Sequence, residues 1–238
     1  MNKPQIIALG GGGFSMEPDN LLLDKYILAQ TGKKRPAVCF LPTASCEADD
    51  YIVRFYKAFV NLPSRPSHLS LFNPPGNLEQ FILSQDVIYV GGGNTKSMLA
   101  LWREWSLDRI FRKAWRQGIV LAGLSAGSIC WFEEGLTDSL PGKLTPLPCL
   151  GFLSGSNCPH YDSEPNRRPA YQRLIKNGRI KKGWAADDGV ALHFIGKKLA
   201  HIISSRPHVA AYNVAKTHTG VKETKLIPHY LGKDIPLH

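Results

Sequence analysis

Residues 119–127 of the chain read Ile-Val-Leu-Ala-Gly-Leu-Ser-Ala-Gly, and this stretch decides the fold. Its first part, 119–124, is almost wholly apolar, which is typical of a central parallel strand covered on both faces. The Gly-x-Ser-x-Gly pattern that follows, together with a helix-compatible segment up to residue 133, predicts a sharp strand-to-helix turn. We therefore expect Ser125 at the tip of this turn, with its hydroxyl directed into a crevice beyond the end of the strand.

Short apolar runs alternate with amphipathic stretches on both sides of this turn. Strands are expected at 6–9, 37–41, 68–72 and 86–90, helices at 21–31, 49–61, 77–84, 96–105, 107–117 and 125–133, and a hairpin at 189–203. This order favours an α/β fold with a mostly parallel sheet and helices on both faces. Because no segment has the composition of a linker, we expect one domain over residues 1–238.

A nucleophilic serine requires a base, and the sequence offers two main candidates. His160 follows a loop rich in Gly, Ser and Asn, where a side chain facing the crevice is expected, and it is preferred. His208, directly after Arg206 and Pro207, is the strongest rival. The alternative for Ser125 is a serine that only makes a turn or binds phosphate.

An acyl-transfer site also needs two hydrogen-bond donors aimed at one oxyanion. The amide of Ala126, next to the nucleophile, is the natural first donor. The glycines at 91–93 end a neighbouring predicted strand, and a glycine amide there can approach a substrate closely. The alternative is that these glycines only make a tight turn.

Composition limits the remaining function classes. The chain has a net charge of +10, but its basic clusters at 33–35, 167–168 and 176–182 lack the interleaved aromatic residues of a base-stacking surface. The glycines at 10–13 lack both the spacing of a dinucleotide-binding motif and a phosphate-loop lysine. No signal peptide or membrane-spanning run is evident, and the five cysteines lack metal-site spacing. We expect a cytoplasmic protein that binds neither nucleic acid nor membrane.

Three blocks of sequence resemble the peptidase E family, which includes the aspartyl dipeptidases and the cyanophycinases. They are Tyr-Val-Gly-Gly-Gly-Asn-Thr at 89–95, Ala-Gly-Leu-Ser-Ala-Gly-Ser-Ile-Cys-Trp-Phe at 122–132 and Pro-His-Tyr at 159–161. The blocks come in the family's order, and the resemblance extends from Ile6 to about Tyr212. It implies a flavodoxin-like α/β fold related to the class I glutamine amidotransferases, with serine in place of their cysteine.

The resemblance also implies roles for individual residues. Ser125 matches the family's nucleophile and His160 its base, while Gly92 and Ala126 match its oxyanion donors. For the acid that orients the base, the best match is Asp138, provided that one connection is slightly shorter in this chain. The alternatives are Glu133 and Glu134, although Glu133, two helical turns beyond Ser125, would point away from the base.

Substrate recognition is where the chain departs from the family pattern. The aspartyl dipeptidases hold the substrate carboxylate with an arginine shortly after the catalytic histidine, where this chain has Pro169 or Ala170. A nearby arginine could replace it through a bidentate contact, and the alternative is a surface basic cluster. The residues expected to contact substrate are Arg167, Arg168, Arg173 and Asn94.

The Gly-x-Ser-x-Gly turn predicts a serine hydrolase, and the resemblance to peptidase E implies a serine peptidase that hydrolyses small peptides through an acyl-enzyme on Ser125. Dipeptidase activity, including Asp-X specificity, and aminopeptidase-like activity are both compatible. No metal or organic cofactor is expected, the expected partner is a small peptide, and a homodimer is one expected assembly. The alternatives are a cyanophycinase-like or other acyl hydrolase and a non-catalytic nucleotide- or nucleic-acid-binding protein.

Overall fold

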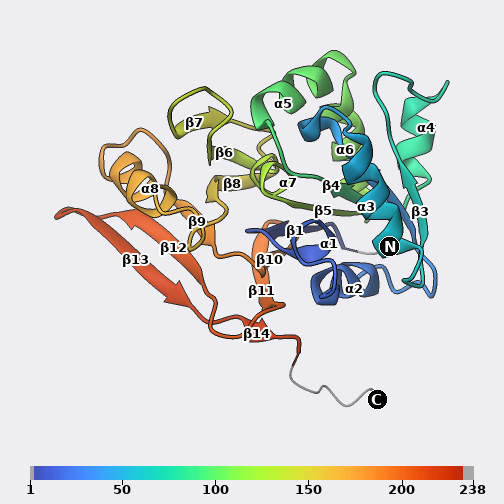
Figure 1. Cartoon of the computed structure of the whole chain (residues 1–238). Coiled ribbons are helices and arrows are strands. Elements are labelled where there is room, and N and C mark those ends of the chain that lie inside the picture. The colour runs from blue at the N-terminus through green and yellow to red at the C-terminus, as the bar shows by residue number, and fades with distance from the viewer. Residues whose placement is uncertain (1–2, 233–238) are drawn as a thin grey trace.

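A parallel sheet forms the centre of the computed structural model, which describes residues 3–232 (Figure 1). Strands β1, β5, β4, β2 and β3 pair in parallel, while β10 and β11 extend the sheet in antiparallel fashion beyond β1. The spatial order is β14 (His229–Tyr230), β11 (Lys198–Ser204), β10 (Val190–Ile195), β1 (Gln5–Leu9), β5 (Val120–Leu124), β4 (Val87–Val90), β2 (Ala37–Leu41) and β3 (Arg65–His68).

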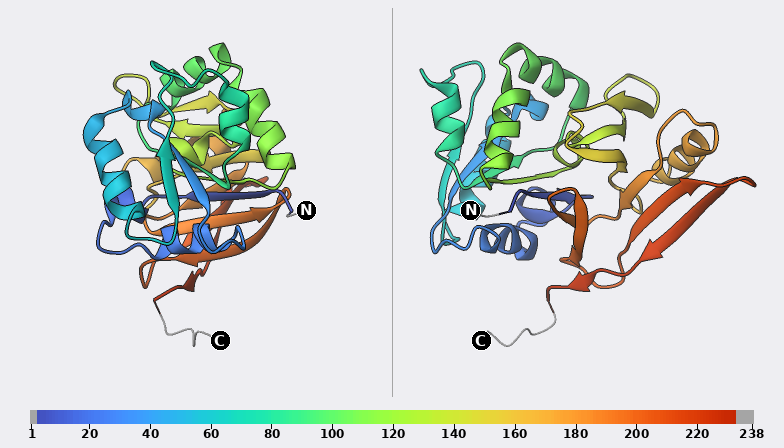
Figure 2. Two further views of the ribbon diagram at one scale, coloured as in Figure 1. Left: turned by 90° about the vertical axis from the view of Figure 1, so that its right-hand side faces the viewer. Right: turned by 180° about the vertical axis from the view of Figure 1, so that it is seen from behind.

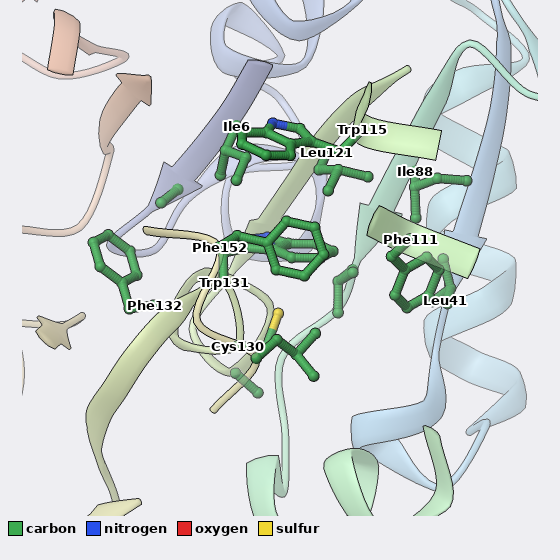
Figure 3. Close-up of a cluster of buried hydrophobic side chains, with 14 of the residues drawn as sticks. Ile6, Leu41, Ile88, Phe111, Trp115, Leu121, Cys130, Trp131, Phe132 and Phe152 are labelled. Atoms are coloured by element: carbon green, nitrogen blue, oxygen red, sulfur yellow. The ribbon is translucent and has the colours of Figure 1, made fainter. Parts of the chain in front are cut away.

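Helices cover both faces of this sheet, because successive residues of its buried strands point to opposite sides. In β1, Ile6 and Ala8 belong to one apolar cluster, and Ile7 and Leu9 to another. Figure 3 shows the first cluster, in which the Trp131 ring contacts the rings of both Phe111 and Phe152. The helices are α1 (Gly13–Met16), α2 (Leu22–Ala29), α3 (Asp49–Phe59), α4 (Leu78–Leu83), α5 (Thr95–Glu104), α6 (Leu107–Arg116) and α7 (Ala126–Ile129), with a 3-10 turn η1 (Thr43–Ser45).

A second sheet, which was not predicted, lies beside the first and projects from it as the β12–β13 hairpin (Figures 1 and 2). Its spatial order is β13 (Val221–Leu226), β12 (Ala211–Lys216), β9 (Gly183–Ala186), β8 (Leu153–Cys158), β6 (Phe132–Thr137) and β7 (Thr145–Pro148). Helix α8 (Arg167–Lys176) packs against it, with Tyr171 and Ile175 in the apolar cluster that also holds Val214.

The predicted α/β fold with helices on both faces is confirmed, and so is the hairpin, which turns at Gly196 between β10 and β11. Two predicted elements were wrong. The helix expected at 125–133 is the single turn α7, since Phe132 already starts β6. The strand expected at 68–72 lies earlier, at Arg65–His68, because the pairing with β2 begins at Arg65. No helix among residues 3–232 has the length and apolar character to cross a membrane.

Candidate active site

Ser125 lies on the turn between β5 and α7 in a strained backbone conformation, with φ 54° and ψ −113°. The two flanking glycines are required by close packing. A Cβ on Gly123 would lie 2.6 Å from the carbonyl oxygen of Gly127, and one on Gly127 would lie 2.3 Å from that of Val90. The Gly-x-Ser-x-Gly pattern therefore reflects a turn pressed against β4, with a half-buried serine at its tip.

His160 is held at the same corner of the molecule as Ser125. The Ser125 amide donates a hydrogen bond to the carbonyl of Leu9 (3.3 Å), and the His160 amide donates to that of Gly10 (3.2 Å). The two residues are thus anchored to consecutive peptide groups at the end of β1. His160 also has a positive φ of 54° and is 8% exposed, so its backbone is strained and its ring is nearly buried.

The carboxylate that contacts His160 is that of Asp188. Its Oδ1 lies 2.7 Å from His160 Nδ1, and its own amide donates to Asp162 Oδ1 at 2.8 Å. Burial alone would raise the pKa of Asp188, but the hydrogen bond and charge of His160, with Ser163 and Arg206, hold this pKa below its ordinary value. The ionised Asp188 is therefore suited to accept a hydrogen bond from a protonated Nδ1, which leaves Nε2 of the imidazole as the basic atom.

The glycine loop after β1 closes over this His–Asp pair. The amide of Gly189 donates to the carbonyl of Gly11 at 3.1 Å, which holds the turn after Asp188 against the loop. A Cβ on Gly11 would lie 2.1 Å from Asp188 Oδ1 and 3.1 Å from His160 Cε1. Gly11 is thus needed because a side chain would occupy the space of the pair.

The three acids expected to orient His160 make other contacts in the structure. Asp138 has a 66% exposed side chain and lies 3.7 Å from Arg167. Glu133 accepts hydrogen bonds from Lys181 and from the Gly155 amide, and Glu134 accepts one from the Lys181 amide. Both glutamates lie on β6 and not on a helix, because α7 ends early.

Asp188 was missed by the sequence reasoning, although a signal was present. It belongs to the Asp-Asp-Gly turn that precedes the predicted hairpin strand at 189–194. This turn joins β9 of the second sheet to β10 of the first, so it could be placed beside His160 only once the second sheet was known. His208, the rival base, has φ 64° and lies between β11 and β12, where it lines a separate cavity.

The two expected oxyanion donors differ in their environment. The amide of Ala126 is the first of α7 and has no partner within that helix. Gly92 lies beside the nucleophile, since a Cβ there would be 3.3 Å from Ser125 Cβ, but its amide donates to the hydroxyl of Tyr51 at 3.1 Å. Burial raises the pKa of Tyr51, which keeps this hydroxyl neutral.

Three of the four residues expected to bind substrate are held by the protein itself. Arg167 is 2% exposed and binds Glu164 and the Leu136 carbonyl. Arg168 pairs with Glu223 and lies over the Tyr161 and Tyr212 rings. Asn94 caps α5 by accepting from the Ser97 amide (2.9 Å) and donates to the Ser139 carbonyl (3.2 Å).

Arg173 differs from the other candidates because it is exposed and lines a cavity of about 620 Å³. Arg173 forms no salt bridge with any of residues 3–232. The cavity is also lined by Ser163, which follows His160 by three residues and helps to lower the pKa of Asp188. The wall carries charges of both signs, from Lys143 and Arg173 on one hand and Asp138 and Glu164 on the other.

Metal ligands are not grouped in the described part of the chain, residues 3–232. No set of three or more His, Cys, Asp or Glu side chains there is placed to hold a metal ion. The five cysteines are free thiols.

Comparison with known proteins identifies the family. The chain is 58% identical over 229 residues to the uncharacterized peptidase YgaJ of Bacillus subtilis strain 168, covering 96% of this chain and 99% of that one. It is 27% identical over 137 residues to the uncharacterized peptidase Lmo0363 of Listeria monocytogenes, covering 54% and 67% of the two chains.

Two solved structures share the fold. A candidate peptidase E protein from Listeria monocytogenes EGD-e superposes with a TM-score of 0.63 at 19% identity, over 94% of this chain and 100% of that one. A peptidase from an acI-B1 actinobacterium gives a TM-score of 0.67 at 16% identity over 95% of both chains. The model of peptidase family S51 matches residues 6–202. The chain therefore belongs to peptidase family S51, as its resemblance to peptidase E predicted.

Proposed function

We propose that the chain is a serine peptidase that hydrolyses small peptides with Ser125, His160 and Asp188 as its catalytic triad. The observation that carries this proposal is the 2.7 Å hydrogen bond between His160 and Asp188 beside a strained, glycine-flanked serine. Such a bond orients the imidazole and stabilises the charge that it gains when it takes a proton. Asp188 replaces Asp138, Glu133 and Glu134 in this role.

The proposed reaction starts when His160 Nε2 takes the proton of Ser125 Oγ. The oxygen attacks the scissile carbonyl of the peptide, and the tetrahedral intermediate collapses as the histidine returns the proton to the leaving amine. Water then attacks the acyl-enzyme with the same histidine as base, which releases the acid product and restores Ser125.

The proposed oxyanion site rests mainly on the Ala126 amide. This N–H lies at the start of α7, where the aligned peptide dipoles also favour negative charge. Gly92 can donate only if its amide exchanges the Tyr51 hydroxyl for the substrate oxygen. We therefore assign Gly92 the second position, with Tyr51 as the group that fills it between turnovers.

The proposed substrate site is the cavity lined by Arg173, which includes Ser163 and Glu164 of the segment after His160 but is lined by neither His160 nor Ser125. A wall that carries both positive and negative side chains suits a short peptide with free amino and carboxyl groups. Arg167 and Arg168 are paired with Glu164 and Glu223, which leaves Lys143 and Arg173 as the cations of this wall. We assign the peptide carboxylate to Arg173, because a guanidinium can bind it through two hydrogen bonds. This favours a dipeptidase over an enzyme that acts on long chains.

The proposal is tested by labelling with a fluorophosphonate, which reacts with activated serines, followed by peptide mapping. We expect one label on Ser125, and we expect Ser125→Ala to lose the label and to lower kcat by a factor of about 10⁴ or more on a dipeptide library. Ser84→Ala serves as the matched control, since its hydroxyl lies at the end of α4, where it donates to the Phe81 carbonyl and accepts from the Gln85 side chain. Retained turnover in a folded Ser125→Ala protein would refute the assignment.

A further inference from the structure

A second cavity, of about 440 Å³, lies where the chain passes twice between the two sheets. One passage joins β11 to β12 and the other joins β13 to β14. Sheet pairing fixes both ends of these passages, since Ser204 pairs with Tyr230 in one sheet and Ala211 with Leu226 in the other. The walls are therefore held in place without a ligand, as in preformed binding sites.

One side of this cavity is basic. Its lining includes Arg206, Lys225 and His208, and no carboxylate of residues 3–232 lines it. Lys225 is exposed on β13 and belongs to none of the salt bridges of this part of the chain. His208 has φ 64°, a conformation that costs about 1 kcal/mol or more in a residue with a side chain.

The opposite side is apolar. Val209, Ile227 and Pro228 line it, and Ile227 remains 75% exposed. An exposed isoleucine beside two cations is unfavourable in water but suits a ligand with an apolar body and an anionic group. An inorganic anion alone would leave the apolar side uncovered.

We propose that this cavity binds a small organic carboxylate with an apolar body, such as an acylated apolar amino acid. Its carboxylate would be held by Lys225 and by the terminal nitrogens of the Arg206 guanidinium, whose Nε is paired with Glu17, and its body would cover Ile227. Arginine makes strong, charge-assisted hydrogen bonds to carboxylates and phosphates, and only an organic anion would also cover the apolar side of the cavity. A volume of about 440 Å³ accommodates a molecule of this size.

Arg206 connects this cavity with the proposed active site. Its Nε donates to Glu17, whose carboxylate also accepts from Ser205 Oγ at 2.6 Å, and its charge acts on Asp188. A carboxylate bound to Arg206 would therefore weaken the positive field at Asp188. A carboxylate bound in this cavity should therefore change kcat modestly. Its binding, however, does not depend on the proposed peptidase function.

The test measures binding to the Ser125→Ala protein by titration calorimetry and by two-dimensional NMR. Three probes are compared: N-acetyl-L-phenylalanine, its uncharged amide and inorganic phosphate. We expect saturable binding of the carboxylate only, with shifts at Tyr230 and Ile227. Lys225→Glu should weaken it about tenfold. Lys222→Glu, which makes the same charge change at an exposed position of β13 outside the cavity, should leave the Kd within about twofold.

Three results would overturn the proposal. Equal weakening by both lysine variants would show that only the net charge matters. Phosphate binding as tight as that of the carboxylate would show that the apolar side contributes nothing. Shifts at Arg173 and Ser163 instead of Tyr230 would place the ligand in the other cavity. Because none of these readouts needs turnover, loss of the proposed peptidase activity would leave the test intact.

Discussion

His160 Nδ1 lies 2.7 Å from Asp188 Oδ1, with the two side chains only 10% and 5% exposed. The chain between them forms α8 and β9, so the pair depends on the second sheet returning the backbone to the end of β1. Asp188 is also held by the hydrogen bond that its backbone amide donates to the Asp162 carboxylate, and its side chain packs against Gly11. A carboxylate fixed from several sides in this way can hold an imidazole in one orientation and one tautomer.

Asp188→Asn should lower kcat by about 10³–10⁴ with little change in KM or fold, because the amide cannot stabilise the imidazolium and favours the wrong tautomer. Steady-state kinetics on the best dipeptide, with circular dichroism as a check of folding, measures this. Glu133→Gln is the matched control, since that carboxylate binds Lys181, which lies just before β9, and the change should leave kcat within about twofold. A larger loss in kcat from Glu133→Gln than from Asp188→Asn would mean that the triad acid is Glu133, on β6, and not Asp188.

Gly11→Ala should displace the His–Asp pair, because the new Cβ would lie 2.1 Å from Asp188 Oδ1. The expected loss in kcat is about 100-fold, as for other small misplacements of catalytic groups. Gly76→Ala is the control, since no atom lies within 4 Å of a Cβ at that position. Full activity of Gly11→Ala would mean that His160 and Asp188 can shift without loss of kcat, so that the close approach of Gly11 is not needed for catalysis.

The first half of the fold could be predicted because its strands are buried on both faces and its helices are amphipathic. Strand β2 lies at the predicted residues, Ala37–Leu41, and β5 differs from its prediction by one residue. The turn at Ser125 was predictable because its flanking glycines leave a local pattern. Local sequence was sufficient wherever local packing decided the conformation.

The second sheet could not be predicted in the same way. Strand β13, Val-Lys-Glu-Thr-Lys-Leu, has an exposed, mostly polar face, and β8 contains a glycine with φ 83°. Such strands are defined by pairing partners that are distant in the chain, and local propensity reports this poorly. The partner of His160 was missed for the same reason, since only the pairing of β9 with β8 places Asp188 near it.

Arg173→Ala should raise KM about tenfold or more for dipeptides with a free carboxyl group while kcat changes little, because the lost contact contributes to binding. The same variant should not change KM for the corresponding dipeptide amides, which lack the charge. Arg179→Ala, an exposed arginine just after α8 that does not line the cavity, is the control. An equal rise in KM for dipeptides and for dipeptide amides would show that Arg173 does not bind the substrate carboxylate.

Asp24→Asn should make the protein more stable above neutral pH. Asp24 is fully buried beneath the glycine loop after β1, and burial raises the pKa of its carboxyl from an ordinary value of 3.8 to about 7. Between these two values the unfolded chain has released the proton and the folded chain still holds it, so this group's contribution to stability falls as pH rises from 4 to 7.

The neutral amide removes this pH dependence. At pH 8 we expect a gain in unfolding free energy on the order of 2–4 kcal/mol, with little or no gain at pH 4. Urea unfolding at the two pH values measures the difference. Asp19→Asn, an exposed carboxyl nearby in the chain, should show the same stability as the parent at both. If Asp24→Asn and the parent lose stability in parallel from pH 4 to pH 8, the carboxyl is already ionised in the folded protein at pH 4, which would contradict the raised pKa.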